Sequence, residues 1–255
     1  MSRSVEPIAS PRTNAPTMRT TAPVTRVVLV LAKAPVAGRA KTRLIPAATP
    51  AGAAGIAAAA LLDTLDAARS VPDARVVVAL EGDVDRAERH AELVDALAGT
   101  VVVPQRGDTL GERITAAHAD VAELFPAAVS VQIGMDTPQV DAALLADALD
   151  LVTADADAAL GLALDGGWWA LALTEPRRAR HIADVPTSRD DTGVATLSAL
   201  RAGHPGLSPA RVLELTPLSD VDTPDDAVAV ADLVPSGRFA RAVSDLLPLS
   251  GGLPR

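Results

Sequence analysis

Cationic side chains gather in one short segment, LAKAPVAGRAKTRLIP, of a chain that is otherwise acidic. The whole chain has 23 Lys and Arg against 32 Asp and Glu, a formal net charge of −9. Gly38 permits a tight turn in this segment, and a looping backbone with free N–H groups and nearby cations binds phosphates. The segment therefore predicts a diphosphate cradle, and the alternative is a solvated basic loop. The cations concerned are Lys33, Arg39, Lys41 and Arg43.

Aspartates follow two other segments that read as strands. Asp136 follows AVSVQIG, and Asp220 and Asp222 follow RVLEL. Mg²⁺ commonly uses one or two carboxylates together with substrate phosphates, and residues two apart in an extended chain point to the same face. These aspartates could therefore hold a metal from opposite sides. The structural alternative is that Asp136, and Asp222 or Thr223, cap the helices that follow, with Pro138 in a first turn.

A third motif joins a turn to the only tryptophans of the chain, in Asp165-Gly166-Gly167-Trp168-Trp169. Asp-Gly-Gly between two apolar runs is typical of a hairpin turn. The carboxylate, the glycines and the indole faces could equally line a pocket for an acceptor. The histidines show no ligand spacing, and we expect each of them at the surface: they are His90, His118, His181 and His204.

The elements that must position these residues alternate regularly between strands and helices. We expect strands over residues 26–33, 74–80, 100–103, 128–134, 157–163, 168–174 and 211–215. We expect helices over residues 51–70, 84–98, 110–124, 139–152, 190–202 and 224–233. This pattern predicts a three-layer α/β/α domain with a mostly parallel mixed sheet and one antiparallel insertion. In such sheets ligands bind beyond the carboxyl ends of the strands, where the cations and aspartates fall.

Composition excludes several classes of function. The absence of cysteine removes disulfides, thiolate zinc sites, iron–sulfur clusters and cysteine nucleophiles. The negative charge and the scarcity of aromatic residues argue against nucleic acid as a partner. We expect a disordered tail over residues 1–25, one nucleotide-binding domain over 26–235 and a C-terminal extension over 236–255. No run of residues suits a signal peptide or a membrane span, so we expect a cytoplasmic protein.

Five motifs carry a resemblance to a known family: KAPVAGRAKTRLIP, QRGDTLGER, GMDTP, GLALDGGWW and DVDTPDD, in this order over about residues 26–230. In these motifs the chain resembles the bacterial DUF2064 family of the glycosyltransferase-A-like, nucleotide-diphospho-sugar transferase superfamily. It also looks like a relative of the molybdenum-cofactor and 2-phospholactate guanylyltransferases. The resemblance implies a glycosyltransferase-A-like (Rossmann-like) fold, a nucleotide-activated donor, and Mg²⁺ or Mn²⁺ as cofactor.

The same resemblance implies roles for individual residues. Phosphate binding falls to the loop after the first strand, at Lys33, Gly38, Arg39, Lys41 and Arg43. Contacts to the base and ribose fall to Gln105, Leu110 and Gly111. Metal binding falls to Asp136 and Asp222. The acceptor side has Asp165, Gly166, Gly167 and Trp168. Within this set we expect Lys41, Arg43 and Asp165 to act in catalysis.

We therefore expect a metal-dependent transferase that uses a nucleotide-activated donor and a small-molecule acceptor. A nucleoside diphosphate as leaving group would make it a glycosyltransferase, which the superfamily favours. Pyrophosphate as leaving group would make it a nucleotidyltransferase. A third alternative is a non-catalytic nucleotide-binding module. Two departures from the family pattern add weight to this third alternative: Met135 replaces a small residue, and two tryptophans replace tyrosines. A third departure is Val185-Pro-Thr-Ser188, which replaces Trp-Ser-Thr and bears on the identity of the acceptor.

Overall fold

One mixed sheet forms the centre of the molecule in a computed structural model that describes residues 26–45, 47–202 and 209–247. Its strand order is β3-β2-β1-β4-β6-β5-β7. The strands are β1 (Arg26–Lys33), β2 (Ala74–Glu81), β3 (Val101–Pro104), β4 (Val129–Gly134), β5 (Ala158–Ala163), β6 (Trp168–Leu173) and β7 (Val212–Leu218). Strand β6 runs antiparallel to β4 and β5, and the other neighbouring pairs are parallel. The predicted mostly parallel sheet with one antiparallel insertion is confirmed.

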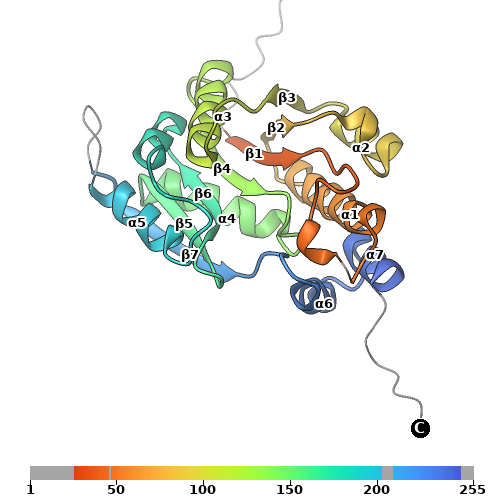
Figure 1. The fold of residues 1–255 in the computed structure, drawn as a ribbon. Helices are drawn as coiled ribbons and strands as arrows, with labels where there is room; N and C mark the ends of the chain where they lie inside the picture. The colour runs from red at the N-terminus through yellow and green to blue at the C-terminus, as the bar shows by residue number, and fades with distance from the viewer. Residues whose placement is uncertain (1–25, 46, 203–208, 248–255) are drawn as a thin grey trace, which may run out of the picture.

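Helices cover both faces of this sheet (Figure 1). The α-helices are α1 (Pro50–Arg69), α2 (His90–Leu97), α3 (Leu110–Leu124), α4 (Ala142–Ala154), α5 (Thr192–Ala202), α6 (Pro224–Leu233) and α7 (Arg238–Leu246). Short 3₁₀ helices are η1 (Thr42–Leu44), η2 (Val84–Arg86) and η3 (Pro176–Ile182). One apolar core joins the sheet to α1, α2 and α4, and a second joins its other face to α3, η3 and α5. The predicted three-layer α/β/α architecture is confirmed.

Strand β1 shows why its continuous apolar sequence suits this position. Val28 and Val30 enter one core, and Val27 and Leu29 enter the other, all at 0% exposure. Because successive side chains of a strand point to opposite faces, a strand covered on both sides needs apolar residues at every position.

Helix α1 is long and apolar enough to cross a membrane by length and composition alone. However, 72% of its apolar window is buried inside the fold, against the sheet and helices α2, α4 and α7. Many of its residues are alanines, which allow close packing on several sides. Helix α1 is therefore a core helix of this domain.

Two expected helices differ from the structure by more than two residues at an end. The helix expected over 84–98 is divided into η2 and α2, because Arg89 adopts a left-handed conformation with φ 55°. The helix expected over 139–152 begins later, at Ala142, and the Asp141 side chain caps it by accepting a hydrogen bond from Leu144 N at 2.8 Å.

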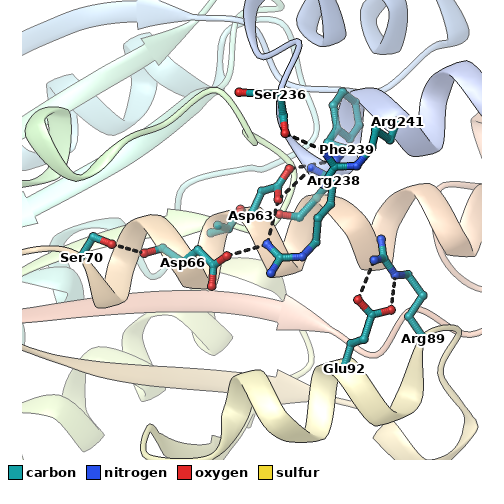
Figure 2. Close-up of polar contacts among 11 residues, drawn as sticks. Asp63, Asp66, Ser70, Arg89, Glu92, Ser236, Arg238, Phe239 and Arg241 are labelled. Atoms are coloured by element: carbon teal, nitrogen blue, oxygen red, sulfur yellow. Dashed lines mark hydrogen bonds and ion pairs between the residues drawn. The ribbon is translucent and has the colours of Figure 1, made fainter.

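Helix α7 lies in the segment expected to be a C-terminal extension, and it packs against α1 and α6. Figure 2 shows how α1 holds its start: Asp63 accepts hydrogen bonds from the backbone nitrogens of Arg238 (3.1 Å) and Phe239 (2.8 Å). The Arg238 side chain also pairs with Asp66. Phe239 is fully buried. Helix α7 is thus part of the packed fold, whereas residues 1–25, the expected tail, lie outside the described residues.

Candidate active site

A cavity of about 530 Å³ opens at the carboxyl ends of the strands. Its walls come from the ends of β1, β2 and β4, the β5–β6 hairpin, helix α3 and the loops before α5 and α6. This is the place where open α/β sheets bind ligands. Polar residues that line it include Lys33, Arg43, Glu81, Gln105, Arg113, Gln132, Asp136, Asp165, Ser188, Asp220 and Asp222.

The loop after β1 brings Lys41 and Arg43 to two of the aspartates. Lys41 has φ 45° and precedes η1, whose Leu44 is fully buried and anchors the loop. Lys41 Nζ lies 3.0 Å from Asp136 Oδ2 and 3.2 Å from Asp222 Oδ1. Arg43 Nη1 lies 2.5 Å from Asp222 Oδ2. Residues from three distant parts of the chain therefore form one charged cluster.

The two carboxylates determine the charge of Lys41. The Lys41 side chain is only 14% exposed, and this burial by itself lowers the pKa of the ammonium. The charges and hydrogen bonds of Asp136 and Asp222 outweigh burial, so the pKa of Lys41 is raised above its ordinary value. Lys41 is therefore a fixed cation at neutral pH.

The aspartates of the cluster are not used as helix caps. Asp141 caps α4, so the structural alternative for Asp136 is wrong. Thr223 caps α6 in a capping box with Asp226, which confirms that alternative for Thr223 and leaves Asp222 free to face Lys41. The backbone nitrogen of Val221 donates to Asp136 O at 3.1 Å, and this bond holds the two loops together.

Asp220 adds a third carboxylate to Asp136 and Asp222, the two that the family resemblance assigns to a metal. Ligand oxygens of Asp136, Asp220 and Asp222 all lie within 4.8 Å of one another. Burial, followed by the negative charges of Asp165, Asp136 and Asp222, raises the pKa of Asp220 to about 6, against the opposing charge of Lys41. Negative charge is therefore in excess here, and clustered carboxylate oxygens are the donors that Mg²⁺ and Mn²⁺ prefer. The residues present fit a divalent cation.

The four cations of the expected cradle do not stay together. Lys33 lies 3.9 Å from Glu81, which also accepts a hydrogen bond from Arg113 at 2.8 Å, on the β2 side of the cavity. Gly38 has φ +73° and forms the turn before Lys41. Arg39 is exposed and does not line the cavity. Of these four cations, Lys33 therefore pairs with Glu81, and Lys41 and Arg43 pair with the aspartates.

Of the three residues expected to contact a base and ribose, two line the cavity. Gln105 donates from Nε2 to Ala32 O and Ala79 O, both at 2.9 Å, so its amide nitrogen holds β1 and β2 together. Leu110 lines the cavity with 44% of its surface exposed. Gly111 does not line it: a Cβ there would lie 2.4 Å from Ala183 O, so this glycine is needed for packing of α3 against η3.

The Asp-Gly-Gly segment is a hairpin turn and also a wall of the cavity. Asp165 Oδ1 accepts a hydrogen bond from Gly167 N at 2.9 Å, and both residues line the cavity with Trp168. Gly166 does not; with φ +94°, it packs so closely that a Cβ would lie 1.9 Å from Asp190 O. Trp169 is buried and donates to Thr216 O at 3.0 Å. Both interpretations of the motif therefore describe part of the structure.

Two of the histidines are buried, so the expectation that each lies at the surface is wrong for these. His118 is 0% and His181 is 6% exposed. His118 Nε2 lies 3.1 Å from Oε1 of Gln132, which lines the cavity. A glutamine inside the apolar sequence of β4 was the available signal, and it was missed.

The comparisons with known proteins agree with this fold. The model of the family described as "Uncharacterized protein conserved in bacteria (DUF2064)" matches residues 64–189. Phosphoenolpyruvate guanylyltransferase of Mycolicibacterium vanbaalenii is 28% identical over 224 residues, which cover 80% of this chain and 90% of that protein.

Solved structures share the fold. A protein of Desulfovibrio desulfuricans G20, described as a nucleotide-diphospho-sugar transferase, has a TM-score of 0.72 and 23% identity, with 86% of this chain and 94% of that chain covered. CMP:2-keto-3-deoxy-manno-octonic acid synthetase in complex with CTP has a TM-score of 0.50 and 15% identity, with 83% and 98% covered. The prediction of a nucleotide-dependent transferase is confirmed at this general level. Residues 64–189 are similar to the DUF2064 family, and the whole chain has the fold of a protein described as a nucleotide-diphospho-sugar transferase.

Proposed function

We propose that this protein is a nucleotidyltransferase that transfers a nucleoside monophosphate from a nucleoside triphosphate to a small acceptor. An acceptor oxygen attacks the α-phosphorus, the bond from that phosphorus to the β-phosphate oxygen breaks, and pyrophosphate leaves. The observation that carries the proposal is the cluster in which Lys41 and Arg43 meet three aspartates beside a cavity large enough for a nucleotide. The similarity to a guanylyltransferase favours this reaction over glycosyl transfer and favours GTP as donor.

Lys41 and Arg43 act on the phosphates in this proposal. Phosphoryl chemistry depends mostly on positioning and on neutralising charge that develops on the departing oxygens. Asp136, Asp220 and Asp222 would hold Mg²⁺ or Mn²⁺, which when bound supplies positive charge that orients and neutralises the triphosphate. Arg43 pairs with Asp222, but its side chain is 71% exposed, so other N–H groups of the guanidinium can reach a bound phosphate.

The remaining parts of the cavity divide between donor and acceptor. Gln105 and Leu110 lie beyond β3 and are the proposed contacts for the base and ribose. Asp165, Gly167 and Trp168 lie on the β5–β6 side and are the proposed acceptor wall, with Asp165 as a candidate catalytic residue. We also propose that the nucleotide-binding domain begins at residue 26 and that the protein acts in the cytoplasm.

Glycosyl transfer from a nucleoside-diphosphate sugar remains the second candidate. It is favoured by the similarity of the fold to a protein described as a nucleotide-diphospho-sugar transferase. A non-catalytic nucleotide-binding module would bind nucleotide without turnover. The leaving group distinguishes the three: pyrophosphate, a nucleoside diphosphate or none.

Calorimetric titration with GTP, GDP, UTP, CTP and ATP, with and without Mg²⁺ or Mn²⁺, tests the proposal. We expect metal-dependent binding of GTP that is tighter than binding of GDP, and pyrophosphate release when phosphoenolpyruvate is added. Asp136→Ala should abolish metal-dependent binding. Asp141→Ala is the matched control, because Asp141 lies close in sequence, caps α4 and does not line the cavity. Tighter binding of GDP than GTP, or binding of neither, would refute the proposal.

A further inference from the structure

A buried histidine–glutamine pair lies under the cavity, apart from the aspartate cluster. His118 of α3 is 0% exposed and Gln132 of β4 is 3% exposed. The two meet at 3.1 Å, between His118 Nε2 and Gln132 Oε1. In the sheet, Gln132 pairs with Leu29 of β1 and Leu171 of β6, which are both core residues. Because polar groups in an apolar core are costly unless hydrogen-bonded, this pair calls for a functional explanation.

The hydrogen-bonding capacity of the pair fixes the orientation of the amide. Burial lowers the pKa of His118 to about 4, so the imidazole is neutral at pH 7 and carries one N–H. His118 Nδ1 is buried and has no hydrogen-bond partner among the described residues. A proton on Nδ1 would be a buried donor without an acceptor, so the proton belongs on Nε2, where it is donated to Gln132 Oε1.

With its amide oxygen bonded to His118, Gln132 has its amide nitrogen available to bind a ligand in the cavity. Within residues 26–45, 47–202 and 209–247, Nε2 of Gln132 has no hydrogen-bond partner. Gln132 lines the cavity together with Ile114 of α3 and Trp168 of β6. An amide nitrogen carries two N–H donors, and these suit an oxygen of a ligand.

We propose that Gln132 binds the acceptor of the proposed transferase through its amide N–H groups and that His118 is the positioning residue that fixes this amide. The proposal rests on the proposed function for the identity of the reaction. It assigns the acceptor class: a small molecule with a carboxylate or phosphate whose oxygens accept from a neutral donor.

The location favours the acceptor over the nucleotide. Strand β4 lies next to β6, and Trp168 of β6 lines the cavity beside Thr187 and Ser188 of the loop before α5. The Gln132 amide and the hydroxyls of Thr187 and Ser188 are neutral donors among the residues that line the cavity. The base and ribose contacts proposed above come instead from residues beyond β3, on the other side of β1.

The test compares binding of phosphoenolpyruvate, in the presence of saturating GTP and Mg²⁺, by the wild-type protein and by variants. Tryptophan fluorescence reports the binding, because Trp168 and Trp169, the two tryptophans of the chain, both line the cavity. The variants are Gln132→Met, His118→Phe, the double variant and His118→Gln. In His118→Gln the new side-chain amide provides an N–H donor in place of His118 Nε2. Ser130→Ala is the matched control, since Ser130 is a buried polar residue of the same strand and face that does not line the cavity.

We expect Gln132→Met to weaken phosphoenolpyruvate binding about tenfold, as for one lost hydrogen bond to a charged group, with GTP affinity unchanged. His118→Phe should weaken it less, His118→Gln should restore part of the loss, and the double variant should match Gln132→Met. Ser130→Ala should bind as the wild type does. Equal binding by Gln132→Met and the wild type, additive effects of the two substitutions, or no binding by the wild type would overturn the inference. Failure of the proposed function would show separately, as loss of GTP binding.

Discussion

Replacing Lys41 with methionine isolates the contribution of one ammonium to the aspartate cluster. Methionine keeps an unbranched stem of similar length but removes the contacts to Asp136 at 3.0 Å and Asp222 at 3.2 Å. Breaking a fully buried ion pair costs about 3–5 kcal/mol, and an exposed pair contributes up to about 1 kcal/mol. The Lys41 side chain is 14% exposed but its partners are about one-third exposed, so water can solvate the carboxylates that remain. We therefore expect Lys41→Met to lower the free energy of unfolding by about 2 kcal/mol.

Urea unfolding in EDTA and in millimolar Mg²⁺ measures this effect. In Lys41→Met no ammonium competes for the carboxylates, so Mg²⁺ should stabilise the variant more than the wild type. Lys33→Met is the control, because the Lys33 side chain is 47% exposed and its nitrogen lies 3.9 Å from Glu81. Its cost should stay below about 1 kcal/mol. No loss of stability for Lys41→Met in EDTA, or a loss that Mg²⁺ leaves unchanged, would refute this account of the cluster.

Three further predictions concern parts of the fold that support the site. Because His118 has a pKa of about 4 when folded, against 6.5 as its ordinary value, the stability that it contributes is present above pH 6.5 and is lost as the pH falls toward 4. Urea unfolding across this range should show a loss of up to about 3 kcal/mol that His118→Phe lacks. Asp63→Ala should cost about 1–2 kcal/mol and make the α7 segment sensitive to limited proteolysis, because the caps on Arg238 and Phe239 are lost. Gly166→Ala should lower the melting temperature and alter Trp168 fluorescence, since the new methyl group would collide with the segment before α5.

The elements that local sequence determines could be predicted closely. Strand β1 (Arg26–Lys33), helix α3 (Leu110–Leu124) and helix α6 (Pro224–Leu233) have the expected bounds. Helices α3 and α6 each begin with a threonine cap that is visible in the sequence. Strand β1 is a continuous β-branched and leucine run, which requires cover on both faces.

Elements whose bounds depend on contacts with distant residues could not be predicted from the local sequence pattern. Helix α7 begins at Arg238 after Gly237, which has no capping side chain, and its first backbone nitrogens bond to Asp63 of α1 instead. The left-handed conformation of Arg89 divides the helix expected over 84–98, and nothing in the local residue types indicates it. Such features result from packing between elements.

In the candidate site as well, features set by local sequence could be predicted, and features set by tertiary packing could not. Asp136 and Asp222 stand at strand ends, so the topology of parallel sheets was enough to expect them together. The pairing of Lys33 with Glu81 was not foreseen, because it needs the register in which β1 and β2 align these two residues. The burial of His118 against Gln132 likewise depends on how α3 lies on the sheet.

The balance of charge around the cavity explains why a metal ion would be needed as well as the cations. Its walls carry more carboxylates than cations: Glu81, Asp136, Asp165, Asp190, Asp220 and Asp222 against Lys33, Arg43, Arg113 and Arg189. Each of these cations is already paired with a carboxylate, which partly neutralises its positive charge. A free nucleotide would therefore meet net repulsion at the walls. The same carboxylates attract a nucleotide that arrives with a divalent counter-ion, so the acidic cluster that opposes phosphate alone becomes a means of selecting the metal complex.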